Sequence, residues 1–409
     1  MSVLEYDVCI VGGGMVGAAL ACALGQDGKL SVAVLEPRPP VEIDPDDPPE
    51  LRVSAITRAS QNLFTSVGAW PGMVKRRISP YRHMTVWDAG GDARIDFDAA
   101  DVGEDDLGYI IENRVVQLAL LERLAAFERV DLLAQAAVAH VEWTGGDSDG
   151  GARVELEDCR VIRTRLVVAA DGARSRVREM AGIGTQGWNY DQHGLVCAVR
   201  TAGSHQATAW QRFLPTGPLA FLPLSDGRCS IVWSTAPDEA ARLRALPESE
   251  FARELAAAFE YRLGEVVEVG PRADFPLRLM NAEEYVRPGL VLVGDAAHNI
   301  HPLAGQGANL GFMDVAVLAD VLSDAASRKR DIGGLRTLRR HARWRKGEVM
   351  TMMAAMDGLK RLFGSSLPGL GGLRRFGLSL TNSTVLLKEM VTRRAMGLTG
   401  DLPTLARRR

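Results

Sequence analysis

The chain has 409 residues, which is enough for two or three domains, each with a core of its own. Charged residues make up 24% of it, the formal net charge is only −3, and no apolar run reaches the ~20 residues that a membrane-spanning helix needs. The five cysteines are scattered, without a CxxC motif or a matching histidine pair. We therefore expect reduced thiols, no disulfide framework and no metal site.

Charge is distributed unevenly along the chain. From residue 328 onward there are 19 Lys and Arg residues against 5 Asp and Glu, whereas residues 1–327 hold 29 against 46. This basic segment also contains amphipathic runs, and two interpretations of it stay open. It lies on an anionic membrane or an acidic partner protein, or it packs on the acidic body of its own chain. We expect no nucleic-acid binding, because no recognition motif accompanies the charge.

The first predicted elements form a nucleotide-binding unit. A buried strand at 6–11 runs into Gly12, Gly14 and Gly17, spaced as GxGxxG, and then into a helix. Gly12 makes the tight turn, Gly14 lets the backbone approach a pyrophosphate, and Gly17 lets the helix pack close to the strand. A second strand ends at Glu36, which is placed to accept hydrogen bonds from ribose hydroxyls. The unit predicts a dinucleotide site but does not separate FAD from NAD.

A second motif follows a strand predicted at 165–170. Asp171 and Gly172 close this strand, and with Ser175 and Arg178 they fill the pattern DGxxSxxR. Taken alone, Asp171 is also consistent with a simple helix cap.

A third motif follows a strand predicted at 290–293. Asp295 stands at its carboxyl end, where an aspartate can bind a ribityl hydroxyl. Gly305 and Gly307 then leave the backbone bare where a flat flavin ring could lie. Asn309 or a neighbour could cap the helix that begins there, so that its amides face the carbonyl edge of the ring. The three motifs together indicate FAD.

The order of these motifs resembles that of the single-component FAD-dependent aromatic hydroxylases, which have the p-hydroxybenzoate hydroxylase fold. Five further segments are similar to the ubiquinone-biosynthesis hydroxylases, and within that family to the 2-octaprenylphenol hydroxylases. They are LRVSAITRAS (51–60), IENRVVQLALLERL (111–124), GPLAFLPL (217–224), VWSTAPDEA (232–240) and GDAAHNIHPLAGQGANLG (294–311).

The order of the motifs and the resemblance imply an α/β fold: a Rossmann-type, glutathione-reductase-like FAD-binding domain with an inserted, mostly antiparallel substrate sheet and a helical tail. We expect a discontinuous FAD domain at 1–77, 98–180 and 275–345, a substrate domain at 78–97 and 181–274, and a basic helical region at 346–409. The chain begins almost at once with a strand, so we expect no cleavable signal and a cytoplasmic protein, peripheral to the inner membrane if the tail binds there.

Several residues receive roles in this scheme. Gly12, Gly14, Gly17 and Glu36 hold the adenosine half of FAD. Arg52 contacts the pyrophosphate or flavin, or else pairs with Glu50 at the surface. Arg114 reaches the phosphates or ribityl chain, or else makes a structural salt bridge. Asp171 and Gly172 bind the cofactor, Asp295 binds the ribityl chain or the pyrophosphate, and Gly305, Gly307 and Asn309 lie by the isoalloxazine ring. His298 and Pro302 are the flavin-adjacent catalytic candidates. No general base is assigned, although His193, His298 and Tyr190 were considered.

The resemblance implies hydroxylation of the aromatic ring of a polyprenylphenol in ubiquinone biosynthesis, through a flavin hydroperoxide formed with dioxygen. NAD(P)H or a protein electron donor would reduce FAD. The basic tail would meet the membrane or other ubiquinone-biosynthesis proteins, and a homo-oligomer is an open alternative. An apolar path for the prenyl tail could be lined by Phe213, Leu219, Phe221, Leu222 and Leu224, although these residues could equally be sheet core.

Three other functions stay open. A hydroxylase of a soluble aromatic acid would place an arginine in the pocket. A flavin reductase of prenyl double bonds would work without dioxygen. A non-catalytic subunit of a quinone-biosynthesis assembly would use FAD only for folding.

Overall fold

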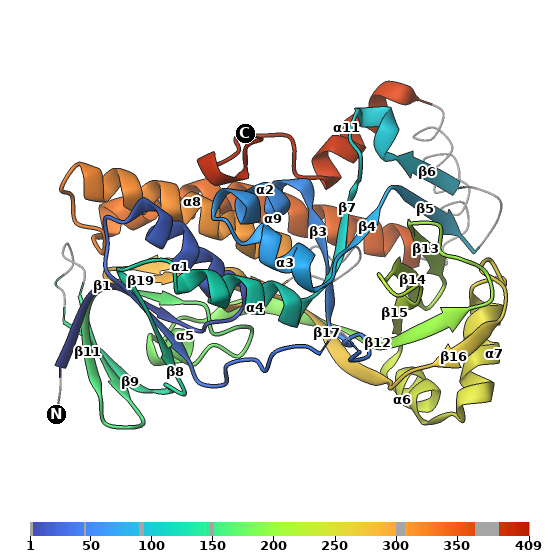
Figure 1. Cartoon of the computed structure of the whole chain (residues 1–409), viewed down its shortest axis with the longest axis horizontal. Coiled ribbons are helices and arrows are strands. Elements are labelled where there is room, and N and C mark those ends of the chain that lie inside the picture. Colours follow the sequence, from blue (N-terminus) through green and yellow to red (C-terminus); the bar gives the residue numbers. More distant parts are fainter. Residues whose placement is uncertain are drawn as a thin grey trace.

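The computed structural model describes residues 3–44, 46–89, 94–144, 146, 151–299, 307–364 and 384–408. The molecule is elongated, with a largely parallel sheet at one end and an antiparallel sheet at the other (Figure 1). Long helices run along one side of both. The amino terminus lies at the end of the parallel sheet, and the described carboxyl-terminal residues lie on the helical side (Figure 1).

The parallel sheet is built from strands that are far apart in sequence. Its parallel part has the order β19-β11-β1-β2-β8, with β18 at one edge and the hairpin β9–β10 added antiparallel to β11. The strands are β1 (Val3–Val11), β2 (Val32–Glu36), β8 (Val130–Ala134), β9 (Val138–Trp143), β10 (Ala152–Leu156), β11 (Val161–Ala169), β18 (Val286–Arg287) and β19 (Leu290–Leu292). The three motif-bearing strands, β1, β11 and β19, are therefore neighbours, and their carboxyl ends meet at one edge.

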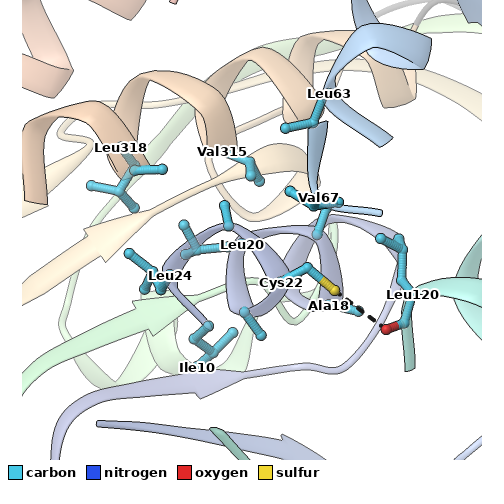
Figure 2. Packing of buried hydrophobic residues seen from close by; sticks show 14 of the residues in the cluster. Ile10, Ala18, Leu20, Cys22, Leu24, Leu63, Val67, Leu120, Val315 and Leu318 are labelled. Carbon is cyan, nitrogen blue, oxygen red and sulfur yellow. Dashed lines mark hydrogen bonds between the residues drawn. The ribbon is translucent and has the colours of Figure 1, made fainter. Parts of the chain in front are cut away.

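Helices α1 (Met15–Asp27), α4 (Asn113–Leu124) and α8 (Gly307–Ser327) cover one face of this sheet. Figure 2 shows Ile10 of β1 beneath the apolar side of α1, with Leu120 of α4 and Val315 of α8 closing the layer. The thiol of Cys22 donates to the Leu120 carbonyl oxygen at 3.3 Å, and burial raises the pKa of Cys22 to about 12 (Figure 2). This thiol is therefore a packing group.

A small three-stranded sheet, ordered β3-β7-β4, connects the two large ones. Its strands are β3 (Val53–Thr57), β4 (Ser79–Tyr81) and β7 (Gly108–Glu112), and it is followed or flanked by the helices α2 (Arg58–Ser66) and α3 (Trp70–Arg76). The Thr57 hydroxyl caps α2 by accepting a hydrogen bond from the Ser60 amide.

The antiparallel sheet has the order β20-β17-β12-β15-β14-β13-β5-β6, with β16 paired to β12. Its strands are β5 (His83–Asp88), β6 (Arg94–Asp98), β12 (Thr185–Thr201), β13 (Thr208–Leu214), β14 (Gly217–Pro223), β15 (Cys229–Thr235), β16 (Val266–Val269), β17 (Ala273–Ala282) and β20 (His298–Asn299). Strands β5 and β6, which lie at residues 83–98, join this sheet through β5, which runs parallel to β13.

The sequence interpretation of this region missed two helices and one boundary. Helices α6 (Pro237–Ala245) and α7 (Glu248–Ala258) cover the outer face of the antiparallel sheet. Pro237 followed by Asp238 and Glu239 was a readable start signal for α6. The boundary expected at 275 falls inside β17, because this strand pairs with β12 along most of its length.

The tail folds back on the body of the chain. Helix α9 (Leu335–Gly364) continues without a break through the boundary expected at 345, and α11 (Val385–Ala395) lies beside the 3-10 turn η1 (Ala99–Val102). Two further short turns are η2 (Gly294–Ala296) and η3 (Thr404–Ala406), and a short helix, α5 (Arg176–Met180), follows β11. In the part of the chain that the structure describes, no helix is both long and apolar enough to cross a membrane.

Candidate active site

The three glycines after β1 have two different physical roles. A Cβ on Gly17 would lie 1.9 Å from the Gly12 carbonyl oxygen, and a Cβ on Gly12, whose φ is +106°, would lie 2.5 Å from the Ala170 oxygen. Main-chain atoms therefore leave no room for a side chain at Gly12 or Gly17. A Cβ on Gly14, which begins α1, would meet no atom within 4 Å, and Gly14 lines a cavity. Open space at a helix amino terminus suits a pyrophosphate.

Glu36 ends β2 beside this turn and is buried. A Cβ on Gly13 would lie 2.8 Å from the Glu36 Cβ, so side chain and turn are in contact. One carboxylate oxygen accepts a hydrogen bond from the Arg38 amide at 2.8 Å. A position sequence reasoning missed is Gln117 of α4, whose amide donates to the Gly13 carbonyl oxygen at 2.9 Å and braces the turn.

The DGxxSxxR motif stabilises the start of the short helix α5 and makes a hydrogen bond to the third motif. Asp171 Oδ2 accepts from the Val177 amide at 3.2 Å, whereas its Oδ1 is buried and has no hydrogen-bond partner among the described residues. Arg178 donates to the carbonyl oxygen of Ala296 at 2.9 Å, in the third motif. Gly172, with φ +84°, lines the cavity. Ser175 caps this helix by accepting from the Arg178 amide at 3.0 Å, and Asp171 accepts from a second amide of its first turn. One Asp171 oxygen is left without a partner beside the cavity-lining residues Ala170 and Gly172.

Asp295 lies on η2, directly after β19, and lines the same cavity. Burial raises the pKa of its carboxyl group, while His298 and Arg52 act in the opposite direction. The turn fits tightly against α1, because a Cβ on Gly294 would lie 3.2 Å from the Val16 side chain.

A buried charged network supports this turn, and sequence reasoning did not find it. Asp314 of α8 accepts from the Gly294 amide at 2.9 Å and lies 2.8 Å from His298 Nε2. Its second oxygen accepts from Arg345 Nε of α9 at 2.7 Å. Burial disfavours the Asp314 carboxylate, but His298 and Arg345 outweigh burial and hold its pKa well below the usual range. Neighbouring His341 is buried, and burial lowers its pKa to about 4, so it is neutral.

His298 is therefore placed differently from the sequence expectation. Its side chain is 3% exposed, points at Asp314 and is not among the described residues that line the cavity. The structure gives it a positioning contact beneath the η2 turn. The other catalytic candidate, Pro302, and the glycine Gly305 lie outside the described residues.

Asn309, which was predicted to cap the helix that begins beside it, makes different contacts. Its side-chain oxygen accepts from the Thr57 amide at 3.1 Å and from the Ser60 hydroxyl at 2.8 Å, and its amide donates to the Ala55 carbonyl oxygen at 2.7 Å. The side chain thus fastens the first turn of α8 to β3 and α2 and does not cap its own helix. Gly307, which begins α8, lines the cavity.

The two arginines expected near FAD line the cavity, but with different partners. Arg114 forms ion pairs with Glu50 at 3.0 Å and with Asp47 at 3.7 Å, as the salt-bridge alternative expects, and it also lines the cavity. Its contact with the phosphates or ribityl chain stays a prediction. Glu50 therefore pairs with Arg114 and not with Arg52. Arg52 is exposed, faces the cavity and lies close enough to Asp295 to lower the pKa of that carboxyl group.

One cavity of about 730 Å³ joins these residues to the antiparallel sheet. Its nucleotide half is lined by Gly14, Arg52, Asn113, Arg114, Gln117 and Asp295. Its second half is lined by one face of β13, β14 and β15, through Ala209, Gln211, Ala220, Leu222, Val232 and Ser234. A nucleotide site and a substrate-sized chamber are therefore continuous.

Strand alternation decides which sheet residues reach this chamber. Leu219 and Phe221 point to the outer face, where they pack against α6 and α7. Leu222, between them and the next turn, lines the cavity. Of the five residues considered for an apolar path, Leu222 alone is among the described lining residues, and Leu219, Phe221, Phe213 and Leu224 are buried elsewhere.

The two remaining base candidates lie away from the described cavity wall. His193 Nδ1 is 2.6 Å from Asp274 Oδ2, and Tyr190 is buried in a cluster with Leu277 and Val349. Neither is among the described lining residues.

The far end of the chamber is closed by the tail. Val391, Thr392, Ala395 and Met396 line it from α11 and the residue after it. Lys388 pairs with Asp101 at 2.7 Å, Arg408 pairs with Glu104 at 3.1 Å, and the Met396 carbonyl oxygen accepts from the Ala59 amide at 3.2 Å. The described part of the basic tail thus packs on the acidic body of its own chain, one of the two alternatives left open by its charge.

These features fit FAD: open space at Gly14, an acceptor oxygen at Asp171, a buried carboxyl at Asp295 and a helix amino terminus at Gly307. Fold and cavity define a flavoprotein of the aromatic hydroxylase class. The crystal structure of p-nitrophenol 4-monooxygenase PnpA from Pseudomonas putida DLL-E4 has the same fold, with a TM-score of 0.78 at 20% identity over 98% of this chain and 99% of that chain.

Sequence comparison narrows this class to a family. The family model "FAD binding domain" matches residues 5–351. The chain is 39% identical over 392 residues to the 3-demethoxyubiquinol 3-hydroxylase of Escherichia coli (strain K12), covering 96% of this chain and 98% of that relative. It is 39% identical over 430 residues to ubiquinone biosynthesis monooxygenase COQ6, mitochondrial, of Xenopus tropicalis, covering 94% and 92%. The chain belongs to the FAD-dependent ubiquinone-biosynthesis hydroxylases.

This membership confirms the predicted family, fold class, cofactor and reaction class: the protein is an FAD-dependent aromatic-ring monooxygenase of the ubiquinone pathway that uses dioxygen and an external reductant. The finer resemblance to the 2-octaprenylphenol hydroxylases stays a prediction.

Proposed function

We propose that the enzyme hydroxylates the ring of an uncharged polyprenylphenol, with the ring in the sheet-lined half of the cavity and the prenyl tail directed toward α11. The observation that carries this proposal is the composition of that half. Methyl, methylene and aromatic groups dominate its walls, from Met84 and Phe97 through Leu222 to Met396. An apolar chain gains free energy from such walls, roughly 25 cal/mol for each Å² removed from water.

The distribution of arginine supports an uncharged ring. The lining arginines among the described residues are Arg52 and Arg114 in the nucleotide half and Arg278, which is exposed on β17. Arg212 of β13 points to the outer face, where it donates to the Ala258 carbonyl oxygen. A carboxylate on the ring would therefore meet no arginine from β13, β14 or β15. This favours a phenol over the soluble aromatic acid that we considered.

In this proposal the chain's own residues divide the work. When bound, FAD supplies the reduced flavin that activates dioxygen for transfer of one oxygen atom to the ring. Gly14, Glu36, Asp171 and Asp295 hold its nucleotide and ribityl parts. The α8 amino terminus, at Gly307, would stabilise negative charge on a flavin bound beside it. The sheet and α11 exclude water from the reacting ring.

The test is mass spectrometry of quinone intermediates in cells that lack this chain, joined to assays of the purified enzyme. We expect a prenylphenol that lacks one ring hydroxyl to accumulate, and the purified enzyme to oxidise NAD(P)H faster when that compound is added. Stimulation by soluble hydroxybenzoates and not by prenylphenols would overturn the proposal. Turnover without dioxygen would indicate the reductase alternative, and quinone synthesis by a flavin-free variant would indicate the non-catalytic one.

A further inference from the structure

Two polar side chains interrupt the apolar sheet face of the chamber. Gln211 of β13 is 6% exposed and Ser234 of β15 is 1% exposed, and both line the cavity. The strand neighbours of Gln211 point the other way, since Trp210 packs edge-on against Trp87 and Arg212 pairs with Glu260. Trp233, next to Ser234, likewise packs in the outer core with Leu219 and Phe221. Alternation therefore directs the Gln211 amide and the Ser234 hydroxyl into the chamber.

No hydrogen bond joins either side chain to another described residue, although Gln211 can make several and Ser234 at least two. Their polar atoms are not among the fully buried atoms without a partner, so these atoms open onto the cavity. An amide and a hydroxyl that open onto a mostly apolar cavity can be hydrogen-bonded only by what enters that cavity, either water or a polar ligand. Proteins retain such groups mainly where a ligand completes them. The two side chains therefore point to a ligand with hydrogen-bonding substituents.

The register places a flat apolar floor between them. Gln211 pairs with Ala220, and Ala220 pairs with Val232, so these three form one row across β13, β14 and β15. Ser234 stands two residues beyond Val232 on the same face. With about 4.8 Å between strands and about 3.4 Å per residue, the two backbone positions lie about 12 Å apart along the diagonal, so their side chains can face opposite edges of one oxygenated ring.

We propose that Gln211 and Ser234 bind the uncharged oxygen substituents of the aromatic ring and so select oxygenated rings in the orientation that hydroxylation requires. The inference rests on the proposed function and names the residues that recognise its ring. A glutamine amide and a serine hydroxyl both donate and accept, which suits hydroxyl and methoxy groups equally. Because neither side chain is charged, the site discriminates against a carboxylated ring by leaving its charge unpaired.

The experiment compares two ligands that differ by one hydroxyl, 2-geranylphenol and geranylbenzene. Their dissociation constants are measured on the FAD-loaded enzyme from the change in flavin absorbance. We expect the wild type to prefer the phenol by about tenfold or more. Because the ligand has one hydroxyl, one of the variants Gln211→Leu and Ser234→Ala should reduce this ratio severalfold, and the double variant should bring it close to one. Gln192→Leu is the matched control, because the Gln192 amide donates to the Thr216 carbonyl oxygen outside the described cavity wall.

Thermal stability separates this role from a structural one. Removal of an unpaired buried amide should leave the melting temperature of ligand-free Gln211→Leu unchanged or raised, whereas loss of a structural hydrogen bond would lower it. An unchanged phenol preference in the double variant would overturn the inference, as would a lowered melting temperature with normal preference. If the wild type binds neither geranyl compound, the proposed function fails. The same variants are then compared on phenol and benzene, where loss of discrimination still supports the inference and its retention overturns it.

Discussion

At the glycine turn beside the nucleotide half, main-chain atoms restrict which residues fit, whereas the wall of the substrate half consists of side chains from alternate strand residues and from a distant helix. Gly12 and Gly17 are fixed by backbone atoms less than 3 Å from where a Cβ would stand. Leu222 reaches the chamber only because of its register in β14. The glycine turn therefore tolerates almost no change of residue type at Gly12 and Gly17, whereas side chains that line the substrate half can be changed while the fold remains.

The largest contrast is within the glycine turn itself. Gly17→Ala should prevent folding, because its Cβ would lie 1.9 Å from the Gly12 carbonyl oxygen. Gly14→Ala should fold with a normal circular dichroism spectrum and melting temperature yet purify with little flavin, because its Cβ enters open space that the pyrophosphate needs. Soluble expression, far-ultraviolet spectra and the absorbance of bound flavin measure the difference. Normal flavin content in Gly14→Ala would contradict the assignment of that space.

The support beneath the nucleotide half should be nearly as sensitive. Arg345→Met leaves the Asp314 carboxylate buried beside His298 with one cation fewer, which should cost about 3–5 kcal/mol of unfolding free energy and weaken FAD binding. Denaturant unfolding and flavin titration measure both effects. The control is Arg340→Met, which removes an exposed pair with Asp324 and should cost at most about 1 kcal/mol. Equal losses in the two variants would show that the buried network has no special role.

The two faces of β14 offer a comparison between adjacent residues. Phe221 is 1% exposed and stacks on Phe259 with 3.8 Å between ring centroids, so Phe221→Ala should cost about 3–5 kcal/mol of stability. Leu222→Ala should cost less than half of that, because its side chain faces the cavity, and should mainly raise KM for a prenylphenol. Calorimetry and steady-state kinetics on both variants decide this. A reversed pattern would mean that the assignment of the two faces is wrong.

The smallest expected effect concerns the part of the chamber wall that α11 contributes. Ala395→Trp should narrow the end of the chamber that α11 lines and raise KM for a long-tailed phenol roughly tenfold relative to a short-tailed one, with stability changed by no more than about 1 kcal/mol. Met390→Trp is the control, since Met390 is 59% exposed and is not among the described lining residues. If Ala395→Trp and Met390→Trp show the same ratio of KM between long-tailed and short-tailed phenols, α11 does not limit the path of the prenyl tail.

The same contrast explains what could be predicted from the sequence. Gly12, Gly14, Gly17 and Glu36 were readable because main-chain geometry demands those residue types at fixed spacings. Asp314 and Arg345 were not readable, because an acid in one helix and a base in another form a pair only through tertiary packing. His298 was misplaced for the same reason: its position in the motif is local, but the direction of its side chain depends on α8.

The substrate half shows a second kind of limit. The mostly antiparallel sheet was predicted in this segment, yet Phe221 and Leu222 could not be separated without knowing which face α6 and α7 cover. Gln211 gave no sequence signal, since a glutamine in a strand is ordinary until its partners are known. The tail's charge left two alternatives open, and contacts such as Lys388 with Asp101 were needed to choose between them for the described residues.

The wall contributed by α11 also fixes an order of events during synthesis. The chamber draws on residues from Gly14 to Met396, and the tail wall leaves the ribosome after every other described wall. A nascent chain can form its glycine turn early, but it has no enclosed chamber in which a reduced cofactor could meet dioxygen beside a bound ring. Chain order thus postpones the assembly of an oxygen-activating compartment until the segments that shield it have been made.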